Sequence, residues 1–589
     1  MIYPLLFLLA AGLNILLGLP QWPHVLAGNL QDPDSYMRLL RIEQGVHAGH
    51  LVTIVAGDQS GHGVMVEWSR LLDMIIWLLA APMAPFLGWH RALFAAGVAL
   101  GPLGVGWLGV SLAWAVEPMA LRRHLWSAAA ASALLPAIAS IALPGVVHYH
   151  VALLALITLT AGCVLRAVRD NVWYGFLAGV CGGFAIWMTP ETMPFVLMAY
   201  GALALRWLYA RNAVVLLATG AGCFDVLGAG LFVDPPAGGY GVPEIDRLSY
   251  VYLALGLILL ASATLLLRVQ QARHARWRGP LGLLVMGLPL LGWMLVFPGV
   301  VEGPAGLLPP AEAKVFFSNI LEQMPPRGLE LIVFLLPGAW AVFYAMTRAW
   351  REWRAPRAPF HADADIDLLG TAPRVPLAWA YVALCAAVAL GLGAGYLLFT
   401  SLSAIFAAAL LPVALSWIEG TGGSQALFKR MALLCLILLG PFLAARANAH
   451  AATPTVGMGK AYPSCALHNI APLLAPAAGQ VVLALPQDTP ELLYRSHIFT
   501  VGSLYHHGIA GFMKDRAAWR ASPGLREPAA VARTDAHYVL FCSTAGRFLL
   551  VADLPRSTLW DALNEGVVPP WLKALAHNKD GWTLYKIVP

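Results

Sequence analysis

Two carboxylates directly follow the first long apolar segment of the chain. They belong to the sequence DPDSYMR, residues 32–38, in which Asp32 and Asp34 flank a proline. Carboxylate oxygens in this arrangement suit Mg²⁺ or Mn²⁺, and one of them could act as a general base toward an acceptor. The alternative is structural, because Asp34 can cap a helix that begins at Ser35.

A second group of polar side chains closes the sequence PGVVHYH, residues 144–150, between two other apolar segments. Its imidazoles, His148 and His150, are separated by one residue and could bind a metal ion or an anionic headgroup. An interfacial polar cap is the alternative interpretation.

Two more carboxylates lie in loops between apolar segments. Glu191 occupies a very short turn, and Glu322 ends the sequence SNILE, residues 318–322. The loop of Glu322 is also consistent with a merely solvated segment, because Glu302, Glu312 and Lys314 lie in the same loop.

The composition predicts a polytopic α-helical membrane protein. Of the 589 residues, 59% are hydrophobic and only 12% are charged, and the mean hydropathy is +0.69. An average soluble domain carries about twice that charged fraction. This excludes a soluble enzyme and a disordered scaffold. A nucleic-acid binder is excluded as well, because the cations behind the net charge of +6 lie in short loops.

The apolar runs predict thirteen membrane spans with a cytoplasmic N-terminus, because this arrangement places the basic loops on the cytoplasmic side. The spans are 2–19, 93–116, 125–143, 151–165, 172–189, 193–208, 213–232, 250–267, 281–298, 329–347, 376–399, 401–417 and 431–447. The basic loops carry Arg122/Arg123, Arg166/Arg169, Arg206/Arg211, Arg268/Arg273/Arg276/Arg278, Arg348/Arg351/Arg354/Arg357 and Lys429/Arg430.

One further apolar segment, Leu71–Gly88, is predicted not to span. It contains Asp73, Pro82 and Pro85, and we expect it to lie along the outer face. Residues 20–92 and 299–328 then form long outer loops, and the C-terminal tail lies outside.

The tail is predicted to form an α/β domain over residues 449–589, after a membrane domain over residues 1–448. Strand-like runs occur at 481–485, 498–502, 538–542, 548–552 and 584–588, with helical stretches at 490–495, 508–520, 558–563 and 570–577. About 140 residues suffice to bury a core. The tail also holds His497, Tyr505, His506 and His507, which suit surface residues as well as ligands.

Cysteine placement separates the two domains. Cys465 and Cys542 lie in the tail and are a disulfide candidate if the compartment is oxidising. The other five cysteines lie in predicted spans, where we expect ordinary packing.

No signature of a soluble enzyme competes with these clusters. The chain has no P-loop, no GxGxxG after a strand, no HExxH and no GxSxG. The spans hold few ionisable groups, whereas ion-coupled transporters usually need some. The pattern favours an enzyme that acts on a lipid-linked substrate at the membrane surface.

With these features the chain resembles a membrane glycosyltransferase of the GT-C fold, and more narrowly the oligosaccharyltransferase catalytic subunit with its bacterial and archaeal single-subunit relatives. The predicted layout is similar to that family over the whole chain. Three short motifs carry the resemblance: DPDSYMRL at 32–39 is similar to the first-loop acidic motif, WSRLLD at 68–73 to the adjoining helical part of that loop, and SNILE at 318–322 to the Ser…Glu motif of the fifth outer loop.

The resemblance implies roles for individual residues. Asp34 would bind a divalent cation, Mg²⁺ or Mn²⁺, and engage the acceptor, with Asp32 beside it. Glu322 would help to hold the acceptor or the metal. We add Arg38 and Arg70 as candidate phosphate contacts, although Arg38 could equally pair with Asp34. Glu191 is a further candidate for substrate binding.

The sequence departs from the family at two points. Many bacterial relatives carry Asp-His-His in the second outer loop, where this chain has His148, Tyr149 and His150. Either histidine then ligates the metal, or the dependence on metal is weakened. The tail lacks the Trp-Trp-Asp signature of sequon recognition, which favours transfer to an acceptor other than a glycosylation sequon.

The implied activity is inverting transfer of a sugar or glycan from a polyprenyl-phosphate or polyprenyl-pyrophosphate donor. The acceptor would be a protein, a lipid or a polysaccharide, and the location a bacterial inner membrane with the tail in the periplasm. A transporter or flippase of lipid-linked sugars and a catalytically inactive GT-C relative are the alternatives.

Overall fold

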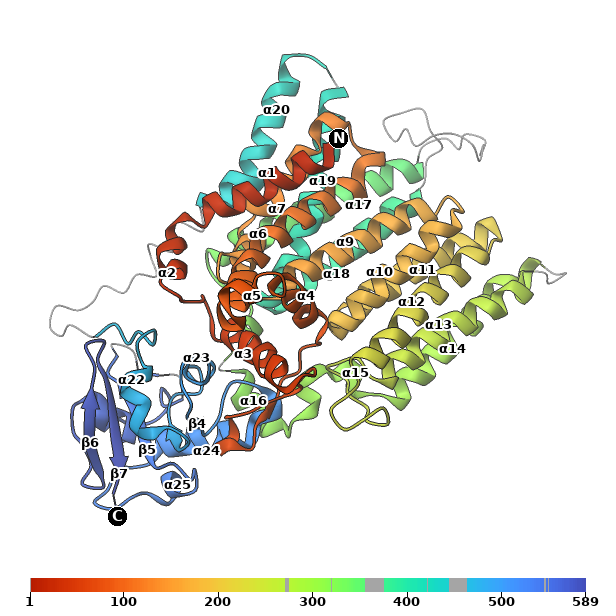
Figure 1. Ribbon diagram of the computed structural model, residues 1–589. Coiled ribbons are helices and arrows are strands. Elements are labelled where there is room, and N and C mark those ends of the chain that lie inside the picture. Colours follow the sequence, from red (N-terminus) through yellow and green to blue (C-terminus); the bar gives the residue numbers. More distant parts are fainter. Residues whose placement is uncertain are drawn as a thin grey trace.

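A bundle of long apolar helices forms most of the molecule, and a smaller α/β region packs against one of its ends (Figure 1). The computed structural model describes residues 2–270, 275–318, 320–354, 376–420, 422–443, 463–544, 547–548 and 550–588. Arg273, Arg357 and Asn319 of the predicted loops lie outside the described residues, as does the predicted domain boundary at 448/449.

Each of the thirteen predicted spans overlaps a helix, although the end of the last one, 444–447, lies outside the described residues. The helices are α1 (Ile2–Leu17), α6 (Trp89–Val116), α7 (Trp126–Leu134) with α8 (Pro136–Ala139), α9 (His150–Ala167), α10 (Val172–Met188), α11 (Met193–Ala210), α12 (Val214–Val233), α13 (Tyr250–Val269), α14 (Ala275–Val296), α17 (Leu336–Arg354), α18 (Pro376–Gly395), α19 (Thr400–Gly420) and α20 (Ser424–Leu434). Within the described ranges, nine helical segments are long and apolar enough to cross a membrane, or up to 11 if each of two bent pairs counts as one span.

A proline explains one of the bent pairs. The helical segments Arg122–Leu134 and Pro136–Ala142 meet at 57°. Leu135 between them has an extended backbone (φ −68°, ψ 121°), which is the conformation favoured before proline. Pro136 then starts α8 at a position where its missing N–H costs no hydrogen bond.

Small residues allow the central helices α10 and α12 to pack closely. A Cβ atom on Gly179 would come within 2.0 Å of the carbonyl oxygen of Thr219, and one on Gly222 within 2.4 Å of that of Phe176. Close backbone approach through glycine is typical of helix pairs in membranes.

The basic residues gather at one end of the bundle. There Arg123 pairs with Glu419 at 2.5 Å, and Arg206 pairs with Asp170 at 2.9 Å. Tyr3, near the N-terminus, donates to Glu117 at the same end, over 2.7 Å. The turns that carry the predicted site carboxylates connect the opposite ends of the helices. The basic loops and the loops with the candidate site carboxylates therefore lie at opposite ends of the folded bundle.

The first loop lies at that opposite end. It contains α2 (Trp22–Leu26), α3 (Pro33–Ala48), the hairpin of β1 (Ile54–Val55) and β2 (Val64–Met65), α4 (Leu71–Ala80) and α5 (Ala84–Leu87). Helix α4 has 10 residues, and at about 1.5 Å per residue it is too short to cross a bilayer. The later loop between α14 and α17 holds α15 (Gly299–Glu302) and α16 (Pro310–Phe317).

The C-terminal region contains a five-stranded sheet in the order β4-β3-β5-β7-β6. The strands are β3 (Val481–Leu483), β4 (Phe499–Thr500), β5 (Tyr538–Cys542), β6 (Leu572–His577) and β7 (Trp582–Ile587). Strand β3 is parallel to β4 and β5, whereas β7 is antiparallel to β5 and β6. The helices around it are α22 (Ala471–Leu474), α23 (Thr489–Arg495), α24 (Ile509–Arg520), α25 (Ala529–Ala532) and α26 (Leu559–Asn564). Cys465 and Cys542 are joined by a disulfide.

Two predictions for this region are wrong. Within the predicted helix 570–577, residues 572–577 form strand β6, because they pair with β7 across a tight turn in which the Asn578 side chain accepts from the backbone of Asp580 and Trp582. Of the predicted strand 548–552, residue 549 lies outside the described residues, and residues 550–552 form a turn, in which the guanidinium of Arg547 donates to the carbonyl of Ala552 at 3.3 Å.

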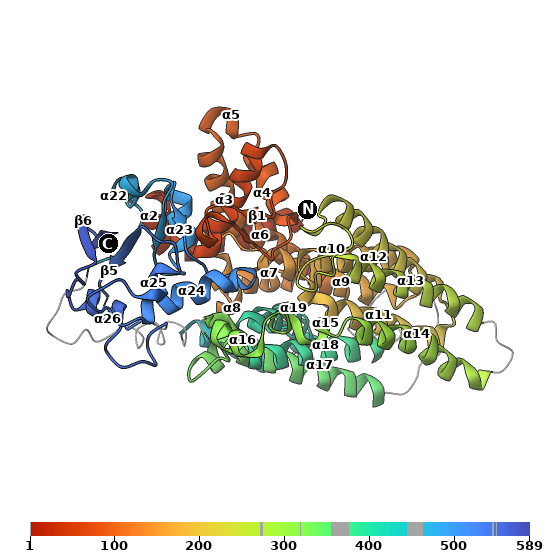
Figure 2. The ribbon, with the colours of Figure 1, turned by 90° about the horizontal axis from the view of Figure 1, so that it is seen from below.

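The C-terminal region docks on the first loop (Figures 1 and 2). The amide of Thr500 donates to the carbonyl of Gly57 at 2.8 Å. The Gln59 side chain bonds backbone groups of Gly508 and Gly511 at 3.0 and 2.9 Å. Arg495 reaches the hydroxyl of Tyr36 at 2.9 Å. These bonds fix the tail against the end of the bundle where the first loop lies.

Candidate functional site

A cavity of about 520 Å³ lies at this junction and collects residues from distant parts of the chain. Its wall is formed by the first loop, the segment before α9, the turn between α10 and α11, the loops before α13 and α17, and the tail. The charged residues and histidines in its lining are Asp32, Asp34, Arg38, Glu67, His148, His150, Glu191, Asp246, Glu322 and His506, and Tyr505 is among its polar residues.

Asp32, and not Asp34, caps helix α3. The helix begins at Pro33, and the Asp32 carboxylate accepts from the amide of Ser35 at 2.8 Å and from its hydroxyl at 2.9 Å. The hydroxyl of Ser35 in turn accepts from the amide of Val147 at 2.8 Å. The predicted cap at Asp34 is therefore wrong by two positions, because proline takes the first helical position and moves the cap before it.

Asp34 is left free of capping and faces the cavity. The hydroxyl of Tyr505 donates to its Oδ1 at 2.8 Å. Removal from water raises the pKa of Asp34 to about 7; the charge of His148 opposes this shift, whereas Asp32 and Glu322 add to it. A carboxyl with this pKa can gain and lose a proton near neutral pH.

His148 forms an ion pair with Asp32, with its Nε2 2.9 Å from Oδ1. Burial works against a charged ring, but Asp32, Asp34 and Glu322 together raise the pKa of His148 to about 9. Burial likewise works against a charged Asp32, but His148 and the bonds from Ser35 hold its pKa below the usual value. The pair is therefore a cation beside a carboxylate at neutral pH.

His150 begins α9 and is buried. Neither of its ring nitrogens has a hydrogen-bond partner within the described part of the chain, and Nδ1 of His148 has none there either. The His150 ring stacks on Tyr149 with centroids 4.4 Å apart. Both histidines line the same cavity as Asp34.

Glu191 and Glu322 enter the cavity from two further turns. Burial raises the pKa of Glu191 to about 7, with Glu322 and Glu67 adding to the shift. The pKa of Glu322 is also raised by removal from bulk water, which His148 opposes and Asp32 reinforces. The carboxyls therefore influence one another although they lie far apart in the sequence.

The two arginines differ in their access to the cavity. Arg38 lines it but is held from behind, because its Nη1 contacts Asp73 at 2.9 Å and its Nε donates to the carbonyl of Val147 at 3.1 Å. The guanidinium also stacks over Trp68, 4.4 Å from the ring centroid. The alternative pairing of Arg38 with Asp34 is therefore wrong.

Arg70 does not belong to the lining of this cavity. Its Nε pairs with Asp234 at 2.5 Å, and its other nitrogens donate to Thr53 and to the carbonyl of Pro235, at 2.9 and 2.6 Å. Arg247 pairs with the same carboxylate at 2.9 Å. Arg70 thus joins the first loop to the loop before α13, and its candidate role as a phosphate contact is corrected to a structural one.

Four residues of the cavity wall were not assigned to the site from the sequence. Tyr505 and His506 were left between surface and ligand, and both are buried in the cavity wall. Asp246 and Glu67 were missed. The available signal was the concentration of charge in the short loop 234–249, which holds Asp234, Glu244, Asp246 and Arg247 in a chain with few charges.

The side chains that are arranged to bind a metal ion are not the predicted ones, although two of them line the same cavity. Within the described ranges, one group of three His, Cys, Asp or Glu residues places its ligand atoms within 4.8 Å of one another, and it consists of Asp246, His506 and His507. The ligand atoms of the predicted set, Asp34, His148 and His150, do not all lie within that distance of one another.

Neither a protein-family model nor a curated protein sequence matches this chain. Solved structures do. The apo oligosaccharyltransferase of Archaeoglobus fulgidus matches with a TM-score of 0.63 at 13% identity, over 92% of this chain and 69% of that one. The same enzyme with an inhibitory peptide and a dolichol-phosphate matches with a TM-score of 0.59 at 13% identity, over 91% and 69%.

A third structure of that enzyme, in complex with Zn and sulfate, matches with a TM-score of 0.58 at 14% identity, over 91% of this chain and 67% of that one. At such low identity the likeness concerns the fold. The chain is thus a polytopic membrane protein with the GT-C fold, and it resembles the oligosaccharyltransferase catalytic subunit over most of its length.

Proposed function

We propose that the protein is a glycosyltransferase that moves a sugar or glycan from a polyprenyl-phosphate or polyprenyl-pyrophosphate donor to an acceptor. The observation that carries this proposal is the convergence of Asp34, Glu191 and Glu322, from three separate loops, in one cavity with His148 and Arg38. Such a cavity combines a group for an acceptor proton with cations for an anionic leaving group.

Asp34 is the group that would orient and deprotonate the acceptor. A general base is most effective when its pKa lies near the working pH, and the pKa of Asp34 is raised to about 7. Glu191 and Glu322 would bind hydroxyl or amide groups of the acceptor from the other side of the cavity. Asp32 would act through His148, which it holds in the charged form.

His148 and Arg38 would face the phosphate of the donor. Both side chains line the cavity, and each is held by a carboxylate behind it, Asp32 and Asp73 respectively. A cation fixed in this way can stabilise negative charge that develops on a departing phosphate. The oligosaccharyltransferase of A. fulgidus in complex with a dolichol-phosphate supports a lipid-linked donor of this type.

A divalent cation fits part of this donor set. Asp34 supplies an oxygen and His150 an imidazole whose nitrogens lack partners among the described residues. Imidazole suits Zn²⁺ better than the Mg²⁺ or Mn²⁺ expected from the sequence, and the A. fulgidus enzyme in complex with Zn supports the same choice. When bound, the cation would offset charge on the leaving phosphate.

The cavity would face away from the cytoplasm. The basic residues lie at the other end of the bundle, and cytoplasmic loops carry the excess of Lys and Arg. A bacterial inner membrane, with a cytoplasmic N-terminus and a periplasmic tail, fits this arrangement. The acceptor would be a protein, a lipid or a polysaccharide presented at that face.

The test compares lipid-linked and surface glycans of a deletion strain with those of its parent, and then complements the deletion with wild type, Asp34→Asn or Asp535→Asn. Asp535 is an exposed tail residue and serves as the matched control. We expect wild type and Asp535→Asn to restore the parental glycans and Asp34→Asn to leave the donor unconsumed. Restoration by Asp34→Asn at equal protein level would contradict the proposal and favour a flippase or an inactive relative.

A further inference from the structure

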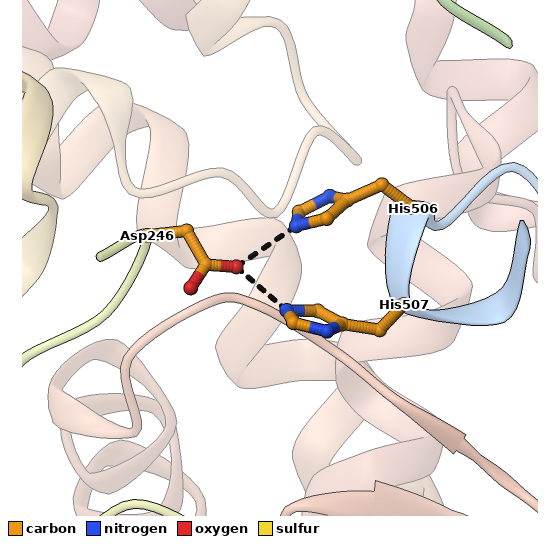
Figure 3. A group of neighbouring side chains, drawn as sticks. All are labelled: Asp246, His506 and His507. Carbon is orange, nitrogen blue, oxygen red and sulfur yellow. Dashed lines mark hydrogen bonds and ion pairs between the residues drawn. The ribbon is translucent and has the colours of Figure 1, made fainter. Parts of the chain in front are cut away.

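A second cluster of ligating side chains joins the tail to the helical bundle. Oδ2 of Asp246, in the loop before α13, lies 2.8 Å from Nε2 of His506 and 2.6 Å from Nε2 of His507. Figure 3 shows the two rings side by side, turned toward the same carboxylate oxygen. Two adjacent histidines of the tail thus contact the same carboxylate oxygen in the loop before α13.

The cluster is buried on the side of Asp246 and His506 and reaches the surface at His507. The exposed fraction is 3% for the Asp246 side chain and 6% for that of His506, and His507 is half-buried at 23%. The second oxygen of Asp246 is buried and has no hydrogen-bond partner within the described part of the chain. A buried carboxylate oxygen without a partner is costly, so the cluster has an acceptor that the protein itself does not satisfy.

A further carboxylate stands behind His506. Oε2 of Glu67 lies 3.9 Å from Nδ1 of that ring, on the side away from Asp246, and is also buried without a partner among the described residues. Histidines that ligate metals through one nitrogen commonly present the other to a carboxylate, which fixes the tautomer. Glu67 lies where such a second carboxylate would contact the Nδ1 of His506.

We propose that Asp246, His506 and His507 bind a Zn²⁺ ion, with Glu67 orienting His506. Two imidazoles and one carboxylate are a common set of protein ligands for zinc. Ligand atoms about 2.0–2.2 Å from a tetrahedral ion lie roughly 3.3 Å apart, so the rings and the carboxylate need to separate by about half an ångström from their hydrogen-bonded positions. The ligand atoms already lie within 4.8 Å of one another.

The fourth position of the ion would open toward the cavity, because Asp246 and His506 line it. A water molecule or an anionic oxygen would occupy that position, as in zinc sites with three protein ligands. This site is separate from Asp34 and His150. It would bind the tail to the loop before α13 whether or not Asp34 acts as a base.

The experiment measures metal binding by the full-length protein, purified without a histidine tag and stripped with chelator. Zn²⁺ alone is titrated, and Co²⁺ serves as a spectroscopic substitute, because tetrahedral Co²⁺ gives a characteristic visible absorption. The variants are Asp246→Asn, His507→Gln and Glu67→Gln. His497→Gln, an exposed histidine of the tail, is the matched control, and Asp34→Asn distinguishes this site from the one in the proposed function.

We expect wild type, His497→Gln and Asp34→Asn to bind Zn²⁺ at this site and to show the Co²⁺ absorption. Asp246→Asn and His507→Gln should each lose one equivalent of metal, and Glu67→Gln should bind roughly 10–100-fold more weakly. Zn²⁺ should raise the melting temperature of Asp246→Asn less than that of wild type, and a cooperative melting transition of the variant without metal shows that it is folded. Equal metal content in wild type, Asp246→Asn and His507→Gln would overturn the proposal, as would an absence of zinc binding by wild type.

Discussion

The hydroxyl of Tyr505 in the tail donates a hydrogen bond of 2.8 Å to Asp34 in the first loop, across 471 positions of sequence. The tail therefore contacts the carboxylate to which we assign the acceptor proton. The bond favours the charged form of Asp34 and opposes the effect of burial on its pKa. The tail thus helps to set the pH at which this carboxylate can act.

Replacing Tyr505 should change the pH dependence of the reaction. In Tyr505→Phe the hydrogen bond is lost, so the pKa of Asp34 should rise above about 7. Because the base must be deprotonated, the acidic limb of kcat/KM should move to higher pH and activity at neutral pH should fall. Tyr538→Phe is the control, since that hydroxyl bonds only the carbonyl of Pro476 among the contacts recorded for it, at 3.1 Å. An unchanged acidic limb would argue against Asp34 as the base.

Asp234 should be important for stability. It accepts from Arg70, Arg247 and the indole of Trp187, at 2.5, 2.9 and 3.2 Å. Asp234→Asn leaves two buried guanidinium groups without their carboxylate, and loss of one partner of a buried ion pair costs about 3–5 kcal/mol. We expect a clear fall in the melting temperature in detergent.

The control for Asp234 is Asp170→Asn at the basic end of the bundle. Asp170 pairs with Arg206 at 2.9 Å, but its side chain is 32% exposed, so its loss should cost no more than about 1 kcal/mol. If the two variants lowered the melting temperature equally, the ion pairs of Asp234 would stabilise the fold no more than the exposed pair of Asp170 and Arg206 does.

Asp515 should make the stability of the tail depend on pH. It lies on α24, fully buried, and neither carboxylate oxygen has a partner within the described ranges. Burial, with Asp58 adding, raises its pKa well above the usual value. The folded state then binds the proton more tightly than the unfolded state, whose pKa is about 3.9. The contribution of Asp515 to the stability of the folded state is therefore fully present below the unfolded pKa. It is lost as the pH rises through the folded pKa.

The measurement for Asp515 compares melting temperatures of wild type and Asp515→Asn at about pH 5 and about pH 8. The variant has no charge to bury, so its advantage over wild type should grow as the pH rises. Asp535→Asn, on the surface of the tail, should show no such trend. A difference that stays constant or shrinks with pH would mean that Asp515 is compensated by a contact to water or to another group.

The bridge between Cys465 and Cys542 should stabilise the tail. It closes a segment of 77 residues, and bridges over loops of such length stabilise by about 2–4 kcal/mol, mainly through the unfolded state. Intact mass with and without reductant should differ by two hydrogen atoms. The double variant Cys465→Ser/Cys542→Ser should melt at a lower temperature, whereas Cys435→Ser, a free exposed cysteine, should not. A protein that keeps the same mass after reduction would contradict the bridge.

The spans could be predicted because length and hydropathy are local properties of the chain. The end of the bundle that carries the site could be predicted as well, since the few carboxylates outside the basic loops are conspicuous in a chain with so little charge. Asp32, Asp34, His148, His150, Glu191 and Glu322 indeed line one cavity. Their individual roles stay predictions.

The errors concern contacts over long distances in sequence. The pairing of His148 with Asp32 spans 116 positions, and that of Arg70 with Asp234 spans 164. Neither pairing can be predicted from a local sequence pattern. Strand β6 has residues with good helix propensity, and only its pairing with β7 makes it a strand. Asp246 was missed because its partners, His506 and His507, lie in the tail.

The hydrogen bond between Gln59 and Gly508 spans 449 positions, and this distance has a consequence for the biosynthesis of the protein. A ribosome that adds about 5–20 residues per second needs roughly 20 to 90 seconds to pass from one to the other. During that time the first loop and the spans can enter the membrane, but the cavity lacks its wall from the tail. A nascent chain would therefore lack the complete cavity, which forms only when the C-terminal region docks on the first loop.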